Sequence, residues 1–257
     1  MLDEVLIDAN HVGVTFAGSH HALAEFDLQI REGEFVSLVG PSGCGKSTFL
    51  RLVAGLQPLS SGTLTVGGAS PARSGQSTRQ VSFVFQEPTL LPWRNVRSNI
   101  ALPLELLGVP QEKRGPAIDK SLELIGLSRS DIAKRPRMLS GGMRMRVSLA
   151  RALVTNPEIL LLDEPFAALD DMMRQQLNED LSRLWMARGW TALFVTHNVA
   201  EAVFLSQRVI VLSRAPGRVI AEIEVPFEFP RTPELRATRE FAELAGLVSQ
   251  ELRGVAA

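Results

Sequence analysis

The stretch Gly40-Pro-Ser-Gly-Cys-Gly-Lys-Ser47 decides the fold of this chain, because it has the GxxxxGK[ST] spacing of a phosphate-binding loop. In such loops backbone N–H groups and the N-terminus of the following helix face the anion, and the lysine adds a positive charge. An apolar run, Glu34-Phe-Val-Ser-Leu-Val39, precedes the loop, so we expect a strand, a loop and a helix in that order. The residues predicted to surround the phosphates are Gly40, Pro41, Ser42, Gly43, Cys44, Gly45, Lys46, Ser47 and Thr48.

The composition restricts what the chain can be. Its 257 residues, 45% of them hydrophobic, can bury a substantial core. The net charge of −1 gives no electrostatic case for a nucleic-acid partner, and the single cysteine, Cys44, excludes an intrachain disulfide. No run approaches about 18 uninterrupted apolar residues, and the first residues are acidic where a signal peptide would be basic. We therefore expect a chain that neither spans nor crosses a membrane.

The pattern along the chain predicts an α/β fold whose nucleotide-binding core is interrupted by a helical insertion. Besides one strong helix from Lys46 to Leu56, short apolar runs predict strands near residues 4–7, 11–16, 22–30, 35–39, 62–66 and 81–85. Prolines punctuate helical patterns after Gln86, and a strand, helix, strand order returns after Pro157, which indicates a parallel sheet. The predicted division is a core of residues 1–86 and 155–225, a helical subdomain of 87–154, and a C-terminal extension with a helix over 226–257.

Adjacent carboxylates follow a strand that is apolar enough to be buried on both faces, Ile159-Leu-Leu-Leu-Asp-Glu-Pro165. Ligands of open α/β sheets collect at such carboxyl ends. Because consecutive side chains diverge, Asp163 can hold a Mg²⁺ ion together with Ser47, while Glu164 faces an attacking water as general base. Lys46 is predicted to reach the β- and γ-phosphates of the nucleotide.

His197 also follows an apolar strand, which ends at Val195-Thr196, and this strand should adjoin the strand that carries Glu164. An imidazole there could bond a phosphate oxygen or the attacking water. A second glycine-rich turn, Leu139-Ser-Gly-Gly-Met143, opens a helix: Ser140 is a plausible N-cap, and Gly141 and Gly142 leave the first N–H groups open to an anion. The arginines of that helix are interpreted as a solvated face, with phosphate contact as the alternative: Arg144, Arg146 and Arg151.

Taken in order, these motifs resemble an ABC-transporter ATPase subunit over about residues 4–225. The resemblance implies one ABC cassette: a RecA-like P-loop core of mostly parallel sheet with N-terminal antiparallel strands, an α-helical subdomain, and a head-to-tail homodimer that binds ATP and Mg²⁺. It implies that Ser140, Gly141 and Gly142 contact the γ-phosphate bound to the partner protomer. It further implies that Gln86 senses Mg²⁺ and water, that Asp170 lies in the loop linking protomers, and that Phe16 stacks on adenine. An ordinary strand residue is the alternative for Phe16.

Three segments are similar to the nitrate, sulfonate and taurine branch of bacterial importers: residues 87–96, 139–143 and 215–218. In that branch the ATPase is a peripheral subunit on the cytoplasmic face of the inner membrane, beneath a polytopic permease served by an external substrate-binding protein. Leu91, Trp93 and Val96 would suit a groove that receives a permease helix, or else they pack within the helical subdomain. Met143 and Met145 stand where the family often has glutamine, which leaves the glycine N–H groups in place.

A soluble ABC ATPase that moves no solute, such as one acting in iron–sulfur assembly, is the alternative function. The transported solute is open, because nothing in this chain is expected to touch it.

Overall fold

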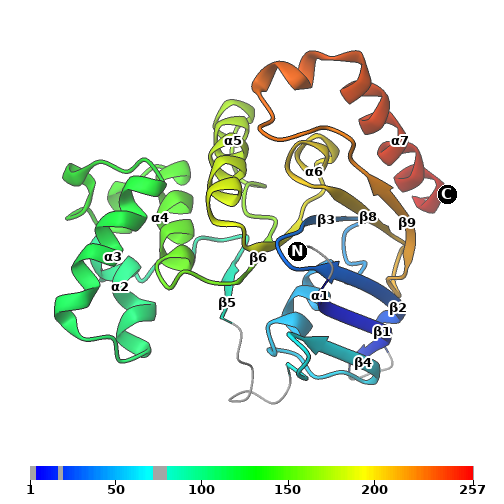
Figure 1. Ribbon diagram of the computed structural model, residues 1–257, viewed down its shortest axis with the longest axis horizontal. Helices are drawn as coiled ribbons and strands as arrows, with labels where there is room; N and C mark the ends of the chain where they lie inside the picture. Colours follow the sequence, from blue (N-terminus) through cyan, green and yellow to red (C-terminus); the bar gives the residue numbers. More distant parts are fainter. Residues whose placement is uncertain (1–3, 17–19, 72–79, 257) are drawn as a thin grey trace.

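The computed structural model describes residues 4–16, 20–71 and 80–256, and it confirms an α/β fold with two sheets (Figure 1). The smaller sheet is antiparallel and has the strand order β2-β1-β4. Its strands are β1 (Val5–Phe16), β2 (His20–Arg31) and β4 (Ser61–Val66). This sheet and the helix α1 (Lys46–Val53) lie on one side of the larger sheet.

The larger sheet has the strand order β5-β6-β7-β3-β8-β9 and is parallel except for its last pair, β8 and β9. Its strands are β3 (Phe35–Val39), β5 (Val81–Val84), β6 (Ile159–Asp163), β7 (Thr191–Val195), β8 (Arg208–Leu212) and β9 (Val219–Glu224). Because β5, β6, β7, β3 and β8 run in the same direction, the segments that follow them all leave from one edge of the sheet. This edge holds the candidate site.

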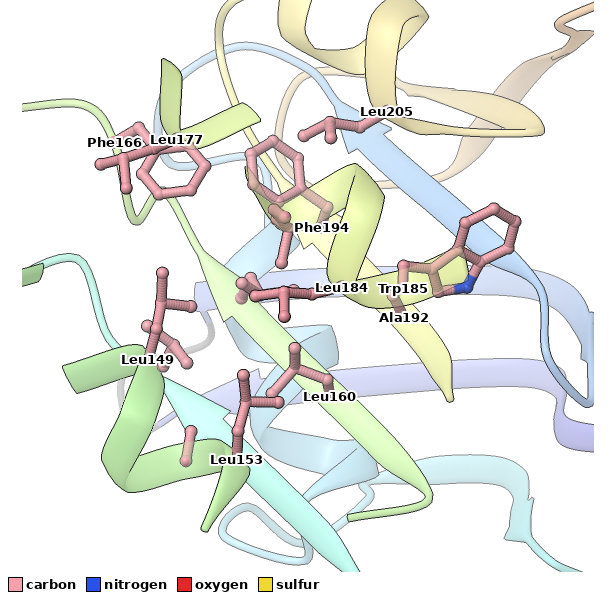
Figure 2. Packing of buried hydrophobic residues seen from close by; sticks show 14 of the residues in the cluster. Leu149, Leu153, Leu160, Phe166, Leu177, Leu184, Trp185, Ala192, Phe194 and Leu205 are labelled. Carbon is pink, nitrogen blue, oxygen red and sulfur yellow. The ribbon is translucent and has the colours of Figure 1, made fainter. Parts of the chain in front are cut away.

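The central strands are buried on both faces, which is why their sequences are continuous apolar runs. Alternate residues of β6 contribute to different cores: Leu160 and Leu162 pack in the helical core, whereas Ile159 and Leu161 pack against α1 and the smaller sheet. Figure 2 shows part of the helical core, where Leu160 lies among side chains of several helices and of β7. The sheet is therefore held rigidly from both sides.

The other helices cover the opposite face of the larger sheet and extend to one side of it (Figure 1). They are α2 (Val96–Leu106), α3 (Gln111–Leu124), α4 (Gly141–Leu153), α5 (Asp171–Arg188), α6 (Val199–Leu205) and α7 (Arg239–Ala256), with short 3-10 turns at Arg129–Asp131, Pro136–Met138 and Pro233–Ala237. Helices α2, α3 and α4 fall within the predicted helical insertion and stand beyond β5. In the described part of the chain, no helix is long and apolar enough to cross a membrane.

Several predicted element bounds differ from the structure. The strands expected near residues 4–7 and 11–16 form one strand, β1, whose pairing with β2 is interrupted by register shifts. Helix α1 ends at Val53 rather than Leu56, because Gly55 adopts a positive φ of 68° that a helix does not continue through. No element is predicted over residues 199–224, where the structure has α6, β8 and β9.

The interpretation of the α4 arginines as a solvated face is wrong for Arg146 and Arg151. Arg146 forms a half-buried ion pair with Asp180 of α5 at 2.7 Å and donates to the carbonyl of Ile125. Arg151 donates to the carbonyls of Pro88 and Thr89. These contacts tie α4 to its surroundings, and of the three arginines only Arg144 is exposed.

A buried guanidinium helps to fasten the C-terminal segment to the core. Arg231 donates through Nη1 to three carbonyls at the end of α6, those of Val203, Phe204 and Ser206, at 2.9–3.0 Å. It also donates to the carbonyl of Phe227 and lies over the Phe229 ring. Burial lowers the pKa of Arg231 to about 10, so the group stays charged at neutral pH.

Replacing Arg231 with alanine should lower the free energy of unfolding by about 3 kcal/mol, because several buried carbonyls lose their donor at once. Urea denaturation followed by circular dichroism measures this change. The matched control is Arg239→Ala on α7, whose exposed side chain pairs with exposed Glu243 and should change stability by less than about 0.5 kcal/mol. Equal stabilities of the two variants would contradict the fastening role.

Candidate functional site

The glycine-rich loop lies between β3 and α1, as predicted, and its backbone is left open at the start of the helix. Gly45 is the N-cap with a φ of 101° and has no side-chain cap, and the first bond into the helix runs from Phe49 N to Gly45 O. The N–H groups of the first turn therefore have no partner within the helix. A Cβ at Gly43, where φ is 77°, would meet nothing within 4 Å.

The loop forms the floor of a cavity of about 280 Å³. Lys46 reaches it from the start of α1, Gln86 from the segment after β5, and Glu164 from the end of β6. The lining residues are Ser42, Gly43, Cys44, Gly45, Lys46, Ser47, Thr48, Gln86 and Glu164. Three segments that are distant in sequence thus meet at the carboxyl edge of the sheet, as expected.

The ammonium group of Lys46 is held inside the loop. Its Nζ donates to the carbonyls of Gly40 and Pro41 at 2.8 and 2.9 Å, and the residue is only 5% exposed. A buried cation beside free backbone N–H groups fits the charge of a phosphate group. Cys44 is fully buried, with its sulfur 3.8 Å from Nζ, and is a packing residue of this loop.

Ser47 and Asp163 form the oxygen pair that the sequence predicts for Mg²⁺. The Ser47 hydroxyl donates to Asp163 Oδ1 at 2.7 Å, across 116 residues of sequence. Burial raises the pKa of Asp163, while the hydrogen bond from Ser47 and the charges of Arg51 and Lys46 act in the opposite direction. A hydroxyl and a carboxylate at this spacing fit the oxygen ligands that Mg²⁺ prefers, and a bound cation would further favour the ionised carboxylate.

Glu164 and His197 are brought together by neighbouring strands. Asp163 of β6 pairs with Val195 of β7, so the residues that follow each strand meet, and His197 Nδ1 lies 3.0 Å from Glu164 Oε2. This confirms the predicted adjacency of the two strand ends. Glu164 has a φ of 45°, and its N–H donates to the carbonyl of Val195. An uncommon backbone conformation of this kind is characteristic of functional turns.

The remaining predicted site residues lie outside this cavity. Ser140 is the N-cap of α4 and accepts from Met143 N, and Gly141 lines a second cavity of about 440 Å³ together with Gln86. Asp170 is exposed and caps α5 by accepting from Met173 N. A Cβ on Gly142 would lie 2.8 Å from the Met173 sulfur, so the starts of α4 and α5 are in close contact.

Phe16 ends β1 with a half-exposed ring that stacks on His20 at a centroid distance of 6.4 Å. Phe16 does not line the cavity around Lys46. Its contact with adenine therefore stays a prediction.

Gly217, between β8 and β9, contacts the phosphate loop from outside and was not predicted as a site residue. Its N–H donates to the carbonyl of Ala22, and its carbonyl accepts from Ala24 N. A Cβ added there would lie 2.0 Å from the backbone oxygen of Cys44. Only the Pro-Gly pair at 216–217 marks this turn in the sequence, and nothing local indicates that it packs against a loop more than 170 residues earlier.

A family model described as ABC transporter matches residues 23–167 of the chain. This chain belongs to the ABC transporter ATP-binding family. The matched residues include the whole phosphate loop, the turn at Ser140 and the carboxylates Asp163 and Glu164. His197, the partner of Glu164, lies beyond the matched segment.

Several curated relatives of this ABC ATPase are import subunits. It is 41% identical to a taurine import ATP-binding protein of Rhizobium johnstonii, over 97% of this chain and 96% of that one. It is 44% identical to an aliphatic sulfonates import ATP-binding protein of Mesorhizobium japonicum, over 92% and 85% of the two chains. A nitrate import ATP-binding protein of Synechococcus elongatus is 41% identical, over 87% and 82%.

Solved ABC cassettes have the same fold. A dimeric ATP-binding cassette in a post-hydrolysis state, with ADP and phosphate bound, superimposes with a TM-score of 0.76 at 30% identity, covering 86% of this chain and all of the other. The cbiO1 component of an ABC transporter complex from Clostridium perfringens has a TM-score of 0.79 at 25% identity and covers 95% of this chain and 96% of its own.

Gly217→Ala should weaken ATP binding about tenfold, because the added methyl group displaces the Cys44 carbonyl and with it the phosphate loop. Fluorescence titration with a labelled ATP analogue measures the change in Kd. Gly246→Ala in α7 is the control, since a Cβ there meets nothing within 4 Å, and its Kd should equal that of the unaltered chain. An unchanged Kd in Gly217→Ala would show that this turn does not shape the loop.

Proposed function

We propose that this chain hydrolyses ATP to drive an ABC importer of a small solute, acting beneath a separate permease. The observation that carries the proposal is the Glu164–His197 contact of 3.0 Å beside the phosphate-loop cavity, since Glu164 lines the cavity that also contains Lys46. A carboxylate next to a phosphate site is placed to accept a proton from water.

The proposed roles follow from the positions of the side chains. The N–H groups of the loop and Lys46 would bind the β- and γ-phosphates, and Ser47 and Asp163 would hold Mg²⁺, which would neutralise developing charge. Gln86 lines the same cavity and can contact Mg²⁺ and the water. Glu164 accepts the proton of the water as general base, and His197 orients Glu164 and contacts the γ-phosphate.

A homodimer would give both glycine-rich turns a phosphate group to bind. The Ser140 turn opens a helix but does not line the cavity around Lys46, so within one chain the two turns serve different places. In a head-to-tail dimer Ser140, Gly141 and Gly142 of one protomer would bind the γ-phosphate held by its partner. Asp170 would lie at the same interface, and Phe16 would stack on adenine.

The importer class is supported by the names of the relatives, which import taurine, aliphatic sulfonates and nitrate. Each of these small solutes carries a sulfonate or nitrate group, and we propose a solute of the same class for this transporter. A soluble iron–sulfur assembly ATPase is not favoured by this set of relatives. The proposed location is the cytoplasmic face of the bacterial inner membrane, with an external binding protein that delivers the solute to the permease.

We propose that the helical subdomain of residues 87–154 meets the permease, while residues 1–86 and 155–225 form the nucleotide-binding core. Trp93 is 68% exposed and Leu91 is half-buried, which suits a docking groove. For Val96 the alternative of packing within the helical subdomain holds, because this residue is 1% exposed and packs in the helical core. Residues 226–257 form the proposed extension.

Glu164→Gln should retain Mg·ATP binding and lower turnover about 100-fold or more, the scale of a lost general base. Steady-state ATPase assays and size-exclusion chromatography with Mg·ATP measure turnover and the trapped dimer. Lys46→Ala is the contrasting variant, because it should lose nucleotide binding itself. Undiminished hydrolysis by Glu164→Gln would exclude the proposed base.

Tagged Glu164→Gln, expressed in its native host and extracted gently with Mg·ATP, should co-purify with a polytopic permease identified by mass spectrometry. Trp93→Ala in the same background should reduce the recovery of the permease, because it removes an exposed aromatic anchor from the proposed groove. Recovery of soluble partners alone would favour the non-transport alternative.

A further inference from the structure

A buried charge pair behind the candidate site has no part in the chemistry described so far. Glu201 of α6 and Arg174 of α5 are largely buried, with side chains 6% and 19% exposed, and Arg174 Nε lies 3.7 Å from Glu201 Oε1. This oxygen is buried and accepts no hydrogen bond from the described residues. Burial raises the pKa of Glu201, so keeping the group ionised has a cost that its neighbours must offset.

Each member of the pair holds one of the loops that carry the reacting groups. Arg174 Nη2 donates to the carbonyl of Leu169 at 2.7 Å, in the loop that begins at Glu164. The other oxygen of Glu201 accepts from the hydroxyl of Thr196, the residue before His197. That hydroxyl also accepts from Asn198 N at 3.0 Å, so Thr196 fixes the backbone on both sides of His197.

These contacts close a ring around the Glu164–His197 hydrogen bond. One half of the ring runs from Glu164 along its loop to Leu169 and Arg174. The other half runs from Glu201 through Thr196 to His197, whose Nδ1 meets Glu164 Oε2 at 3.0 Å. The pairing of β6 with β7 sets the distance between the Glu164 loop and the His197 loop where they leave the sheet. The Arg174–Glu201 pair fixes the distance between the same two loops at a second point, behind them.

We propose that Arg174 and Glu201 are a pair of positioning residues that hold Glu164 and His197 in hydrogen-bonding geometry. This inference rests on the proposed hydrolytic function. A pair that acts through geometry should affect turnover rather than nucleotide binding, because it does not touch the phosphate loop, and small displacements of reacting groups lower rates steeply. The members should also act as a unit, so that removing the second adds little to removing the first.

The test compares Glu201→Gln, Arg174→Met and the double variant. Each single change should lower kcat about tenfold and leave KM for ATP within about twofold, and the double variant should be no slower than the slower single variant. Glu34→Gln is the matched control: Glu34 is a similarly buried carboxylate, 9% exposed, that pairs with Arg208 at 2.9 Å at the opposite edge of the sheet. It should lower the melting temperature comparably and leave kcat unchanged.

Three results would overturn the inference. The first is a kcat of Glu201→Gln within twofold of the kcat of Glu34→Gln, and the second is a change in KM for ATP with no change in kcat. The third is a double variant whose loss of kcat equals the product of the two single losses. Melting temperatures show which variants fold. If Glu201→Gln does not fold, the kcat of Arg174→Met decides the test. If the unaltered chain hydrolyses ATP and Glu164→Gln does not, a failure here concerns only the positioning pair. If the unaltered chain has no ATPase activity, the proposed function itself fails.

Discussion

The parallel pairing of β3, β6 and β7 is the constraint on which the rest of the site depends. Because these strands run the same way, the phosphate loop, the carboxylates at the end of β6 and the histidine after β7 emerge at one edge. Burial of both sheet faces leaves the strands little freedom to slide, since a shift of one residue would exchange the side chains of the two cores. The 2.7 Å contact of Ser47 with Asp163 and the 3.0 Å contact of His197 with Glu164 follow from that alignment.

Much of this arrangement is predictable from sequence, because each motif carries its own local signal. The phosphate loop has fixed glycine spacing, Asp163 and Glu164 end a run that only a buried strand explains, and the parallel order follows from strand, helix, strand alternation. The adjacency of His197 and Glu164 could be predicted for the same reason. The roles of Gln86, Asp170 and Phe16 came from family resemblance and stay predictions.

The unpredicted parts share a physical cause, which is that their partners are distant in sequence and carry no pattern. Gly217 matters because of a carbonyl at Cys44, and Arg174 matters because of a carboxylate on the next helix. The sequence suggests that Arg146 and Arg151 are surface residues, because arginine usually is, but backbone carbonyls and Asp180 accept hydrogen bonds from their guanidinium groups. A single sequence gives residue types and spacing, but it does not identify such tertiary partners.

Arg231 has a consequence for how the molecule unfolds. Its guanidinium has no carboxylate partner among the described residues and depends on the carbonyls that end α6, where the helix dipole is negative. Helix α6 begins beside His197, so the C-terminal segment and the catalytic edge share one element. The contacts of Arg231 therefore bridge the sequence boundary near residue 225, and we expect the C-terminal segment to unfold together with the core that it contacts.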